Sequence, residues 1–225
     1  MIKNKENTIA AIEAQGILPL FYDEDARLSA DIIRTLYRAG IRVLEYTNRG
    51  HAALANFKYL KTVAIAEMPD LFLGVGTIKN LPELADFLAA DADFVVCPVM
   101  DAEVGKMVHG LDKLWIPGCL TPTEINQAYQ QKAGIVKLFP ANLLGPSFLS
   151  AIRELFPGQR FVPTGGVEIE AANISGWFKA GVCAVGLGSK LIRKEILEKQ
   201  DHETLFSLTM KALEIVKEVK SQPTN

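Results

Sequence analysis

The sequence has 225 residues, a formal net charge of −2 and three cysteines. This length suits one α/β domain with a large core, and the small net charge without a Lys/Arg-rich segment argues against a nucleic-acid partner. No apolar run is long enough to cross a membrane, and no signal-peptide core follows Met1. We therefore expect a cytoplasmic protein whose partner is a small molecule.

Apolar runs and amphipathic segments alternate along the chain. A leading helix is predicted over Glu6 to Gln15, and a last outer helix over Asp201 to Lys220. Strands are predicted near 17–22, 42–47, 72–77, 94–98, 114–119, 135–140, 160–165 and 184–189. The clearest helical patterns between them cover 26–39, 81–90, 121–132 and 146–156. Such alternation predicts right-handed βαβ units and a parallel sheet.

A recurring Ala-Gly pair marks the joints between helix and strand. It occurs in Ala39-Gly40-Ile41, Ala133-Gly134-Ile135 and Ala180-Gly181-Val182, where glycine can take the left-handed conformation past a helix end. Eight repeats predict a closed (β/α)8 TIM barrel with an extra N-terminal helix, and an open doubly wound sheet is the alternative. We expect one domain over 1–225, with a frayed polar tail over 221–225.

The three cysteines, Cys97, Cys119 and Cys183, are widely spaced and each lies in an apolar segment. This pattern favours reduced thiols in the core over disulfides or a zinc site. No cluster of acidic residues and histidines has the spacing of metal ligands, so we expect no metal. The histidines His51, His109 and His202 fall in helical or flanking segments, and His51 is the best placed of them for a catalytic role because it follows Arg49.

A single charged residue, Lys137, interrupts the predicted buried strand over 135–140. A buried ammonium is costly, so such a lysine must find a partner or lose its proton, and a neutral amine is a nucleophile. This is the chemistry of a Schiff-base enzyme. The structural alternative is a lysine at a strand end that reaches solvent or pairs with an acid.

The second predicted strand supplies a partner for this lysine. Alternation places Val43, Glu45 and Thr47 on one face, and Arg49 as well if the strand continues that far. The same rule turns Lys137 inward together with Phe139, so Lys137 and Glu45 can meet inside the barrel near the C-terminal ends of the strands. The structural alternative is a buried pair plus a surface arginine, although buried pairs often add no net stability.

Glycine-rich segments follow the last two strands, as Thr164-Gly165-Gly166 and as Gly186-Leu187-Gly188-Ser189. In barrels these loops commonly hold phosphate, because glycine lets backbone N–H groups approach an anion and a following helix N-terminus adds partial positive charge. Tight turns are the alternative for each loop alone. Leu191 stands where a dinucleotide-binding fingerprint needs its third glycine, so that interpretation is rejected.

Several motifs together resemble the 2-keto-3-deoxy-6-phosphogluconate (KDPG) and 4-hydroxy-2-oxoglutarate (KHG) aldolase family, whose members are class I, Schiff-base lyases; the KDPG aldolases serve the Entner-Doudoroff pathway of carbohydrate metabolism. The resemblance covers almost the whole chain. It is carried by Val43-Leu44-Glu45-Tyr46-Thr47-Asn48-Arg49, Gly74-Val75-Gly76-Thr77, Pro117-Gly118-Cys119, Val136-Lys137-Leu138-Phe139-Pro140-Ala141 and Pro163-Thr164-Gly165-Gly166-Val167.

The resemblance implies a role for each of these positions. Lys137 would form a covalent imine with substrate without any cofactor, and Glu45 would be the general acid/base. Arg49 and Thr77 would hold the pyruvate-derived carboxylate, while Pro98 and Phe139 would line the pocket. The remaining substrate contacts would come from Thr164 beside the substrate chain and from the phosphate ligands Gly165, Gly166, Gly188 and Ser189. The resemblance also implies a homotrimer.

Two departures leave the substrate open. Tyr22 follows the first strand where some relatives carry arginine, and Asn142 follows Phe-Pro-Ala where others carry an acid. The segment from Leu144 to Phe156 is also similar to the aldolase for the epimeric 2-keto-3-deoxy-6-phosphogalactonate (KDPGal). A barrel that binds a phosphorylated metabolite without catalysis remains an alternative, and a phosphosugar epimerase is a third, although it would need a second acid/base or a metal set that the sequence does not supply.

Overall fold

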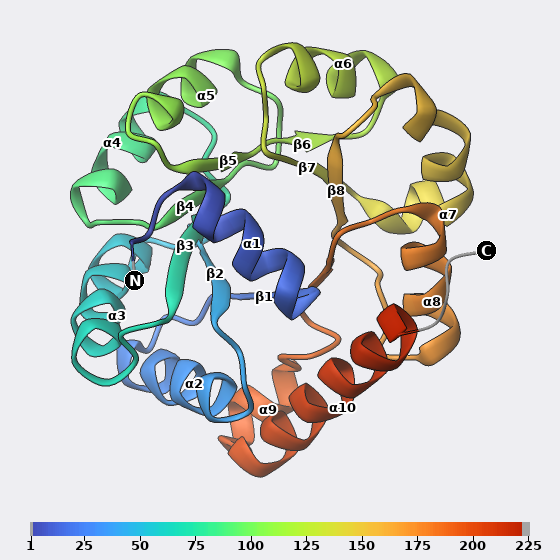
Figure 1. Cartoon of the computed structure of the whole chain (residues 1–225). Coiled ribbons are helices and arrows are strands. Elements are labelled where there is room, and N and C mark those ends of the chain that lie inside the picture. The colour runs from blue at the N-terminus through green and yellow to red at the C-terminus, as the bar shows by residue number, and fades with distance from the viewer. Residues whose placement is uncertain (1, 222–225) are drawn as a thin grey trace.

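The structure is a computed structural model that describes residues 2–221. Nine parallel strands lie at its centre with helices around them (Figure 1). The strands are β1 (Ile17–Phe21), β2 (Val43–Thr47), β3 (Phe72–Gly76), β4 (Phe94–Val96), β5 (Leu114–Ile116), β6 (Gly118–Cys119), β7 (Ile135–Leu138), β8 (Arg160–Pro163) and β9 (Val185–Leu187). Each predicted strand segment contains an observed strand, and the fifth holds both β5 and β6.

The helices follow the strands in alternation. They are α1 (Lys5–Gln15), α2 (Ala26–Arg38), α3 (Ala53–Glu67), α4 (Leu81–Ala89), α5 (Ala102–His109), α6 (Pro122–Gln130), α7 (Ala141–Ile152), α8 (Ala171–Ala180), α9 (Lys194–Lys199) and α10 (His202–Ser221), with a 3₁₀ turn, η1 (Arg153–Leu155). Helices α2 to α8 surround the strands, and α1 lies across one end of them (Figure 1). The predicted alternating α/β fold with parallel strands is therefore confirmed.

The closed barrel is confirmed only in part, because the strands form two hydrogen-bonded sections of a curled sheet. One section has the order β5-β4-β3-β2-β1-β9, and the other has the order β6-β7-β8. Pro117, which has no N–H to donate, separates β5 from β6 within one continuous segment. At the other junction a single parallel bridge joins Thr164, after β8, to Gly186 in β9.

The inner face of the curled sheet is apolar near the start of each strand. One cluster of buried side chains joins the strands across the interior, and Ile9 and Ile12 of α1 cover it. Its strand members include Leu18, Val43, Phe72, Phe94, Leu114, Ile135 and Val162, and it also includes Ala184, directly before β9. A second cluster fills the layer between the sheet and the outer helices, and it includes Val136 and Leu138 as predicted from alternation.

Three boundaries differ from the sequence-based expectation. The left-handed residue after α6 is Lys132, with φ of 58°, and not Gly134, whose lack of a side chain instead admits Leu114 and Ile9. Helix α7 begins at Ala141, earlier than predicted, and is interrupted by the positive-φ, non-helical conformation of Gly145 (φ 69°, ψ 168°). Ser221 belongs to α10, and the rest of the predicted tail, 222–225, lies outside the described residues.

The cysteines are free thiols in the core, as predicted. Cys97 and Cys119 are buried and Cys183 is half-buried. Burial raises the pKa of each thiol to about 12, so none is an effective nucleophile at neutral pH. Within residues 2–221, every helix is too short or too polar to cross a lipid bilayer.

The N-terminal ends of the strands are tied together by polar side chains. Gln15, the last residue of α1, accepts hydrogen bonds from the backbone N–H groups of Arg42 (2.6 Å) and Val43 (3.0 Å). Its amide also donates to the carbonyl groups of Ile17 (2.7 Å) and Val43 (2.8 Å). This side chain therefore joins α1 to the beginnings of β1 and β2 and leaves none of its own polar atoms unpaired.

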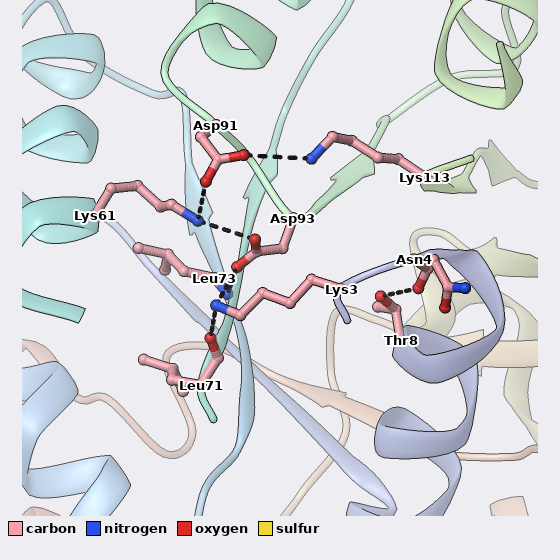
Figure 2. Close-up of polar contacts among 9 residues, drawn as sticks. All are labelled: Lys3, Asn4, Thr8, Lys61, Leu71, Leu73, Asp91, Asp93 and Lys113. Atoms are coloured by element: carbon pink, nitrogen blue, oxygen red, sulfur yellow. Dashed lines mark hydrogen bonds and ion pairs between the residues drawn. The ribbon is translucent and has the colours of Figure 1, made fainter. Parts of the chain in front are cut away.

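A buried ion-pair network lies at the same end of the molecule (Figure 2). Asp93, 1% exposed, accepts from Lys61 of α3 at 2.9 Å, from the Leu73 backbone N–H at 2.7 Å and from Lys3 at 3.1 Å. Lys61 also pairs with Asp91 at 3.2 Å. One carboxylate thus holds the segment before α1, helix α3 and strand β3 together, which makes this network a stabilising element.

We expect Lys61→Met to lower the free energy of unfolding by about 3 kcal/mol, because it removes one partner of a buried pair and leaves carboxylate charge behind. Lys113→Met is the matched control. Among residues 2–221 the Lys113 ammonium has one ion-pair partner, Asp91 at 3.6 Å, and the Asp91 side chain is 69% exposed, so the expected loss is below about 1 kcal/mol. Urea unfolding measures both values, and equal losses in the two variants would contradict this role of the network.

Candidate functional site

Lys137 and Glu45 meet inside the curled sheet, as the alternation of their strands predicts. Lys137 lies in β7, where it is paired with Gly118 of β6 and Val162 of β8. Glu45 lies in β2, paired with Leu20 of β1 and Gly74 of β3. The two residues come from different sections of the sheet, yet Lys137 Nζ lies 3.9 Å from Glu45 Oε1.

This pair is almost completely removed from solvent. Lys137 is 5% exposed and Glu45 is 1% exposed. Glu45 Oε1 is buried and has no hydrogen-bond partner among the described residues. The ring of Phe139 lies 5.3 Å from Lys137 Nζ. An amine and a carboxylate with an unused acceptor atom, held together in an apolar interior, can act as a nucleophile and as an acid/base that moves protons to and from it.

The space for the Glu45 carboxylate depends on Gly76. A Cβ atom at this position would lie 1.7 Å from Glu45 Oε1, so no other residue fits without moving the carboxylate. The sequence analysis quoted Gly74-Val75-Gly76-Thr77 as a motif but assigned Gly76 no role. The signal was present, since Gly74 and Gly76 are two residues apart on a strand and therefore face the same side.

Thr77, at the end of β3, has a left-handed backbone with φ of 65°. For a β-branched residue this conformation costs on the order of 1–3 kcal/mol and occurs mainly at functional sites. Thr77 is half-buried, and Gly76, directly before it, contacts Glu45. The strained backbone therefore places the Thr77 hydroxyl at the same end of the sheet as the buried pair.

Arg49 lies in the loop that follows β2, but the strand does not continue as far as this residue. Strand β2 ends at Thr47, whose carbonyl accepts a hydrogen bond from the Arg49 backbone N–H at 3.0 Å. The Arg49 side chain is exposed. Its guanidinium group is therefore presented to solvent from the end of the strand that carries Glu45, and the backbone of the loop sets its position.

Pro98 and Phe139 follow β4 and β7, the two strands that flank the continuous β5–β6 segment. Pro98 follows β4 and is half-buried, and Phe139 follows β7 and is also half-buried. Gly118 permits this arrangement, because a Cβ atom there would lie 2.4 Å from the Pro98 carbonyl oxygen. Close approach of the backbones after β4 and in β6 therefore brings Pro98 next to the strand that pairs with Lys137.

The glycine-rich loop after β8 is built from left-handed residues. Gly165 and Gly166 have φ of 90° and 86°. The Gly165 carbonyl accepts from the Asn142 backbone N–H at 2.8 Å, and a Cβ atom on Gly166 would lie 2.5 Å from Asn142 Cβ. Thr164 is buried and bridges to Gly186. Asn142, which stands where some relatives carry an acid, therefore contacts this loop directly.

The loop after β9 is a tight turn. The Gly188 carbonyl accepts from the backbone N–H groups of Leu191 and Ile192, both at 2.9 Å. Ser189, the first residue inside this turn, is exposed. Lys190 pairs with Glu168 at 2.7 Å, which joins this turn to the loop after β8. The expected helix N-terminus does not follow immediately, because α8 begins at Ala171 and α9 at Lys194.

The histidines lie apart from the buried pair. His51 has a side chain that is 86% exposed, 3.8 Å from Glu24. His109 packs edge-on against Trp115, with ring centroids 5.8 Å apart, and His202 lies 3.3 Å from the Thr35 hydroxyl. None of these contacts among the described residues involves Lys137 or Glu45.

Comparison with known proteins connects this geometry to one family. The family model described as "KDPG and KHG aldolase" matches residues 9–208. A solved structure of a KDPG aldolase from Legionella pneumophila, with pyruvate captured as a covalent carbinolamine intermediate, superposes with a TM-score of 0.82 at 26% identity; the match covers 91% of this chain and 97% of that chain.

Curated relatives agree with this match. The 2-dehydro-3-deoxy-phosphogluconate aldolase of Treponema pallidum (strain Nichols) is 30% identical over 208 residues, which is 92% of this chain and 96% of the relative. The 2-dehydro-3-deoxy-6-phosphogalactonate aldolase of Escherichia coli (strain K12) is 35% identical over 123 residues, or 54% of this chain and 58% of the relative. The chain therefore belongs to the KDPG and KHG aldolase family, and it is an enzyme of the lyase class.

Proposed function

We propose that this chain is a class I aldolase that cleaves 2-keto-3-deoxy-6-phosphogluconate to pyruvate and glyceraldehyde 3-phosphate through an imine on Lys137. The observation that carries the proposal is the buried Lys137–Glu45 pair. Lys137 Nζ lies 3.9 Å from Glu45 Oε1, and this oxygen accepts no hydrogen bond from the described residues. A pair kept only for stability would satisfy both partners, because an unpaired buried acceptor costs about 1–3 kcal/mol. Function explains why that cost is tolerated.

The second buried lysine shows what a structural lysine looks like in this protein. Lys61 is 4% exposed, close to the exposure of Lys137, but it contacts the carboxylates of Asp93 and Asp91 at 2.9 and 3.2 Å. Lys137 has one carboxylate at 3.9 Å and an aromatic ring beside it. The Lys137 amine is therefore held by fewer ionic contacts than the Lys61 amine, so fewer contacts must break when it attacks a carbonyl group.

The chemistry we propose begins when the Lys137 amine adds to the C2 ketone and water leaves, which gives a protonated imine. Glu45 moves the protons of this step and then accepts the proton of the C4 hydroxyl, directly or through water. The C3–C4 bond breaks because the imine accepts its electron pair as an enamine. Glyceraldehyde 3-phosphate leaves, C3 is protonated, and hydrolysis of the imine releases pyruvate. The imine is the electron acceptor, so the proposed mechanism requires no metal or cofactor.

The two ends of the substrate are assigned to opposite groups of loops. In this proposal Arg49 and the Thr77 hydroxyl bind the carboxylate, since both follow the strands that hold Glu45 and its glycine neighbour Gly76. Pro98 and Phe139 line the reacting carbons. The phosphate binds the glycine loops after β8 and β9, through Gly165, Gly166, Gly188 and Ser189, with Thr164 beside the substrate chain. The left-handed conformations of Gly165 and Gly166 support the assignment of the loop after β8, because they turn successive N–H groups toward one side.

The KDPGal epimer is the second candidate substrate. The partial likeness to the phosphogalactonate aldolase of Escherichia coli favours it, and Asn142 lies against the phosphate loop where it can affect substrate choice. Cleavage assays with both epimers and with 4-hydroxy-2-oxoglutarate decide between them by their kcat/KM values.

The same proposal includes a fully closed (β/α)8 barrel, supported by the Thr164–Gly186 bridge. It also includes a homotrimer and a cytoplasmic location.

Trapping of the imine tests the proposal. After incubation with pyruvate and sodium borohydride, we expect peptide mass spectrometry to find a reduced pyruvate adduct on Lys137 and none on Lys61, the equally buried internal control. Lys137→Arg should remove both the adduct and cleavage. If folded wild-type protein gives no adduct on Lys137, the mechanism is wrong, and a phosphorylated-metabolite-binding protein without aldolase activity becomes the better interpretation.

Gly76→Ala tests whether the position of the Glu45 carboxylate matters. Because the new methyl group would displace Oε1, we expect kcat for cleavage to fall by about 100-fold, comparable to the loss of an acid/base. Gly110→Ala is the control, since its nearest neighbour, the Met107 carbonyl oxygen, lies 3.4 Å from the new Cβ. An unchanged kcat in folded Gly76→Ala would argue against a catalytic role for Glu45.

Ser189→Ala separates phosphate binding from imine formation. Loss of one hydrogen bond to a charged phosphate is worth about 1.5 kcal/mol, so KM for the phosphorylated substrate should rise about tenfold. The yield of the pyruvate adduct should remain that of the wild type, because pyruvate carries no phosphate. Ser207→Ala, on the exposed side of α10, is the control. Equal losses of phosphate affinity and adduct would contradict the assignment of these loops.

A further inference from the structure

Tyr22, which directly follows β1, has a buried hydroxyl group without a partner among the described residues. Burial is the main cause that raises the pKa of Tyr22, and the neighbouring charge of Glu24 adds to it. The side chain is therefore a neutral phenol at physiological pH. A buried hydroxyl without a partner carries a free-energy cost, so the ring must be held in place by packing.

Contacts with β2 and α3 hold Tyr22 and the residue after it in place. Its ring centroid lies 5.8 Å from that of Tyr46, which is fully buried. The next residue, Asp23, is held by its carbonyl oxygen, which accepts from the Tyr46 hydroxyl at 2.7 Å and from the Asn56 amide at 3.1 Å. Strand β2 and helix α3 thus hold the chain directly after Tyr22, and the Tyr46 ring packs against the phenol, so the phenol is a rigid support.

The residue that rests on this support is Gly50. A Cβ atom on Gly50 would lie 2.1 Å from Tyr22 Oη, 2.5 Å from Cζ and 2.7 Å from Cε1. The ring edge therefore contacts the Gly50 backbone. Gly50 in turn begins the turn before α3, since its carbonyl accepts from the Ala53 N–H at 3.1 Å. The loop after β2 cannot move toward β1 without meeting the phenol.

Arg49 is the residue whose position this contact decides. Its side chain is exposed, and its backbone N–H bonds to Thr47 on one side while Gly50 packs against Tyr22 on the other. We propose that Tyr22 is a positioning residue: its ring holds the backbone at Gly50 so that Arg49 presents its guanidinium to the carboxylate of the keto acid. This inference rests on the proposed function, and it assigns to Tyr22 the affinity for the pyruvate end of the substrate.

We assign this role to the ring edge. Tyr22→Phe keeps Cζ and Cε1, which would lie 2.5 and 2.7 Å from a Cβ atom on Gly50, so it should preserve the affinity for pyruvate. Tyr22→Leu removes the support on one side of the contact. Gly50→Ala disturbs the same contact from the other side, because its methyl group and the phenol cannot occupy the same space.

The experiment measures the pyruvate concentration that gives half-maximal borohydride-trapped adduct on Lys137, together with KM and kcat for cleavage. We expect Tyr22→Leu and Gly50→Ala to raise the half-maximal concentration and KM about tenfold, the scale of a weakened charge-assisted hydrogen bond, with kcat within about threefold of wild type. Tyr22→Phe should keep the half-maximal pyruvate concentration and KM of the wild type. Tyr59→Leu, on the exposed side of α3, is the control for loss of a tyrosine ring.

A double-mutant cycle with Arg49→Ala decides whether Tyr22 acts through Arg49. In the Arg49→Ala background, Tyr22→Leu should cause no further loss of pyruvate affinity, because there is no guanidinium left to position. Additive losses, or wild-type affinity in either Tyr22→Leu or Arg49→Ala, would overturn the inference while leaving the aldolase mechanism intact. Absence of the adduct in wild-type protein would instead refute the proposed function, so the two failures are distinguishable. If Tyr22→Leu does not fold, Gly50→Ala takes its place in the cycle.

Discussion

The burial of one carboxylate and one amine inside the curled sheet is the constraint on which the rest of the site depends. Glu45 and Lys137 are almost without solvent contact, and the carboxylate keeps an unpaired oxygen. Charged groups are tolerated in such an interior only where the surrounding backbone leaves room for them and little else. Here Gly76 supplies that room beside Glu45, and Gly118 is the strand neighbour of Lys137.

The interior consequently changes in character along the strands. Near the strand beginnings it is filled by large apolar side chains such as Phe72 and Phe94, covered by α1. Farther along the strands the inner positions include Glu45, Lys137 and Gly76, so polar groups and space interrupt the apolar packing. Both halves are needed, because the packed half makes the sheet rigid and a rigid sheet holds two charged groups from different sections 3.9 Å apart.

The two ends of the curled sheet differ in the same way, because one end holds stabilising contacts and the other holds the candidate site. The ion pairs of Asp93 tie a helix and a strand together at the end where α1 lies (Figure 2). The hydrogen bonds of Gln15 join α1 to two strands at the same end. At the opposite end Thr77 has a strained backbone, and Gly165 and Gly166 are left-handed. Among the left-handed non-glycine residues of the described chain, Thr77 is the one that is β-branched, and Glu45 Oε1 without a hydrogen bond lies close to it. Backbone strain beside such a group is typical of active sites. Tyr22, directly after β1, packs against Gly50 in the loop that carries Arg49, the carboxylate-binding arginine of the proposed enzyme.

By itself the sequence determined the alternating parallel fold, the eight strand segments and the inward direction of Lys137 and Glu45. Period-two alternation and buried β-branched runs are local properties, and the side-chain direction follows from them. The sequence did not determine that Arg49 leaves the strand, that Lys132 and not Gly134 is left-handed, or that Pro117 divides the sheet. Those features depend on which backbones meet in space. Nor could local pattern reveal that Gly76 makes room for Glu45, or that Gly50 rests on Tyr22, because each contact joins two strand ends that only the tertiary structure brings together.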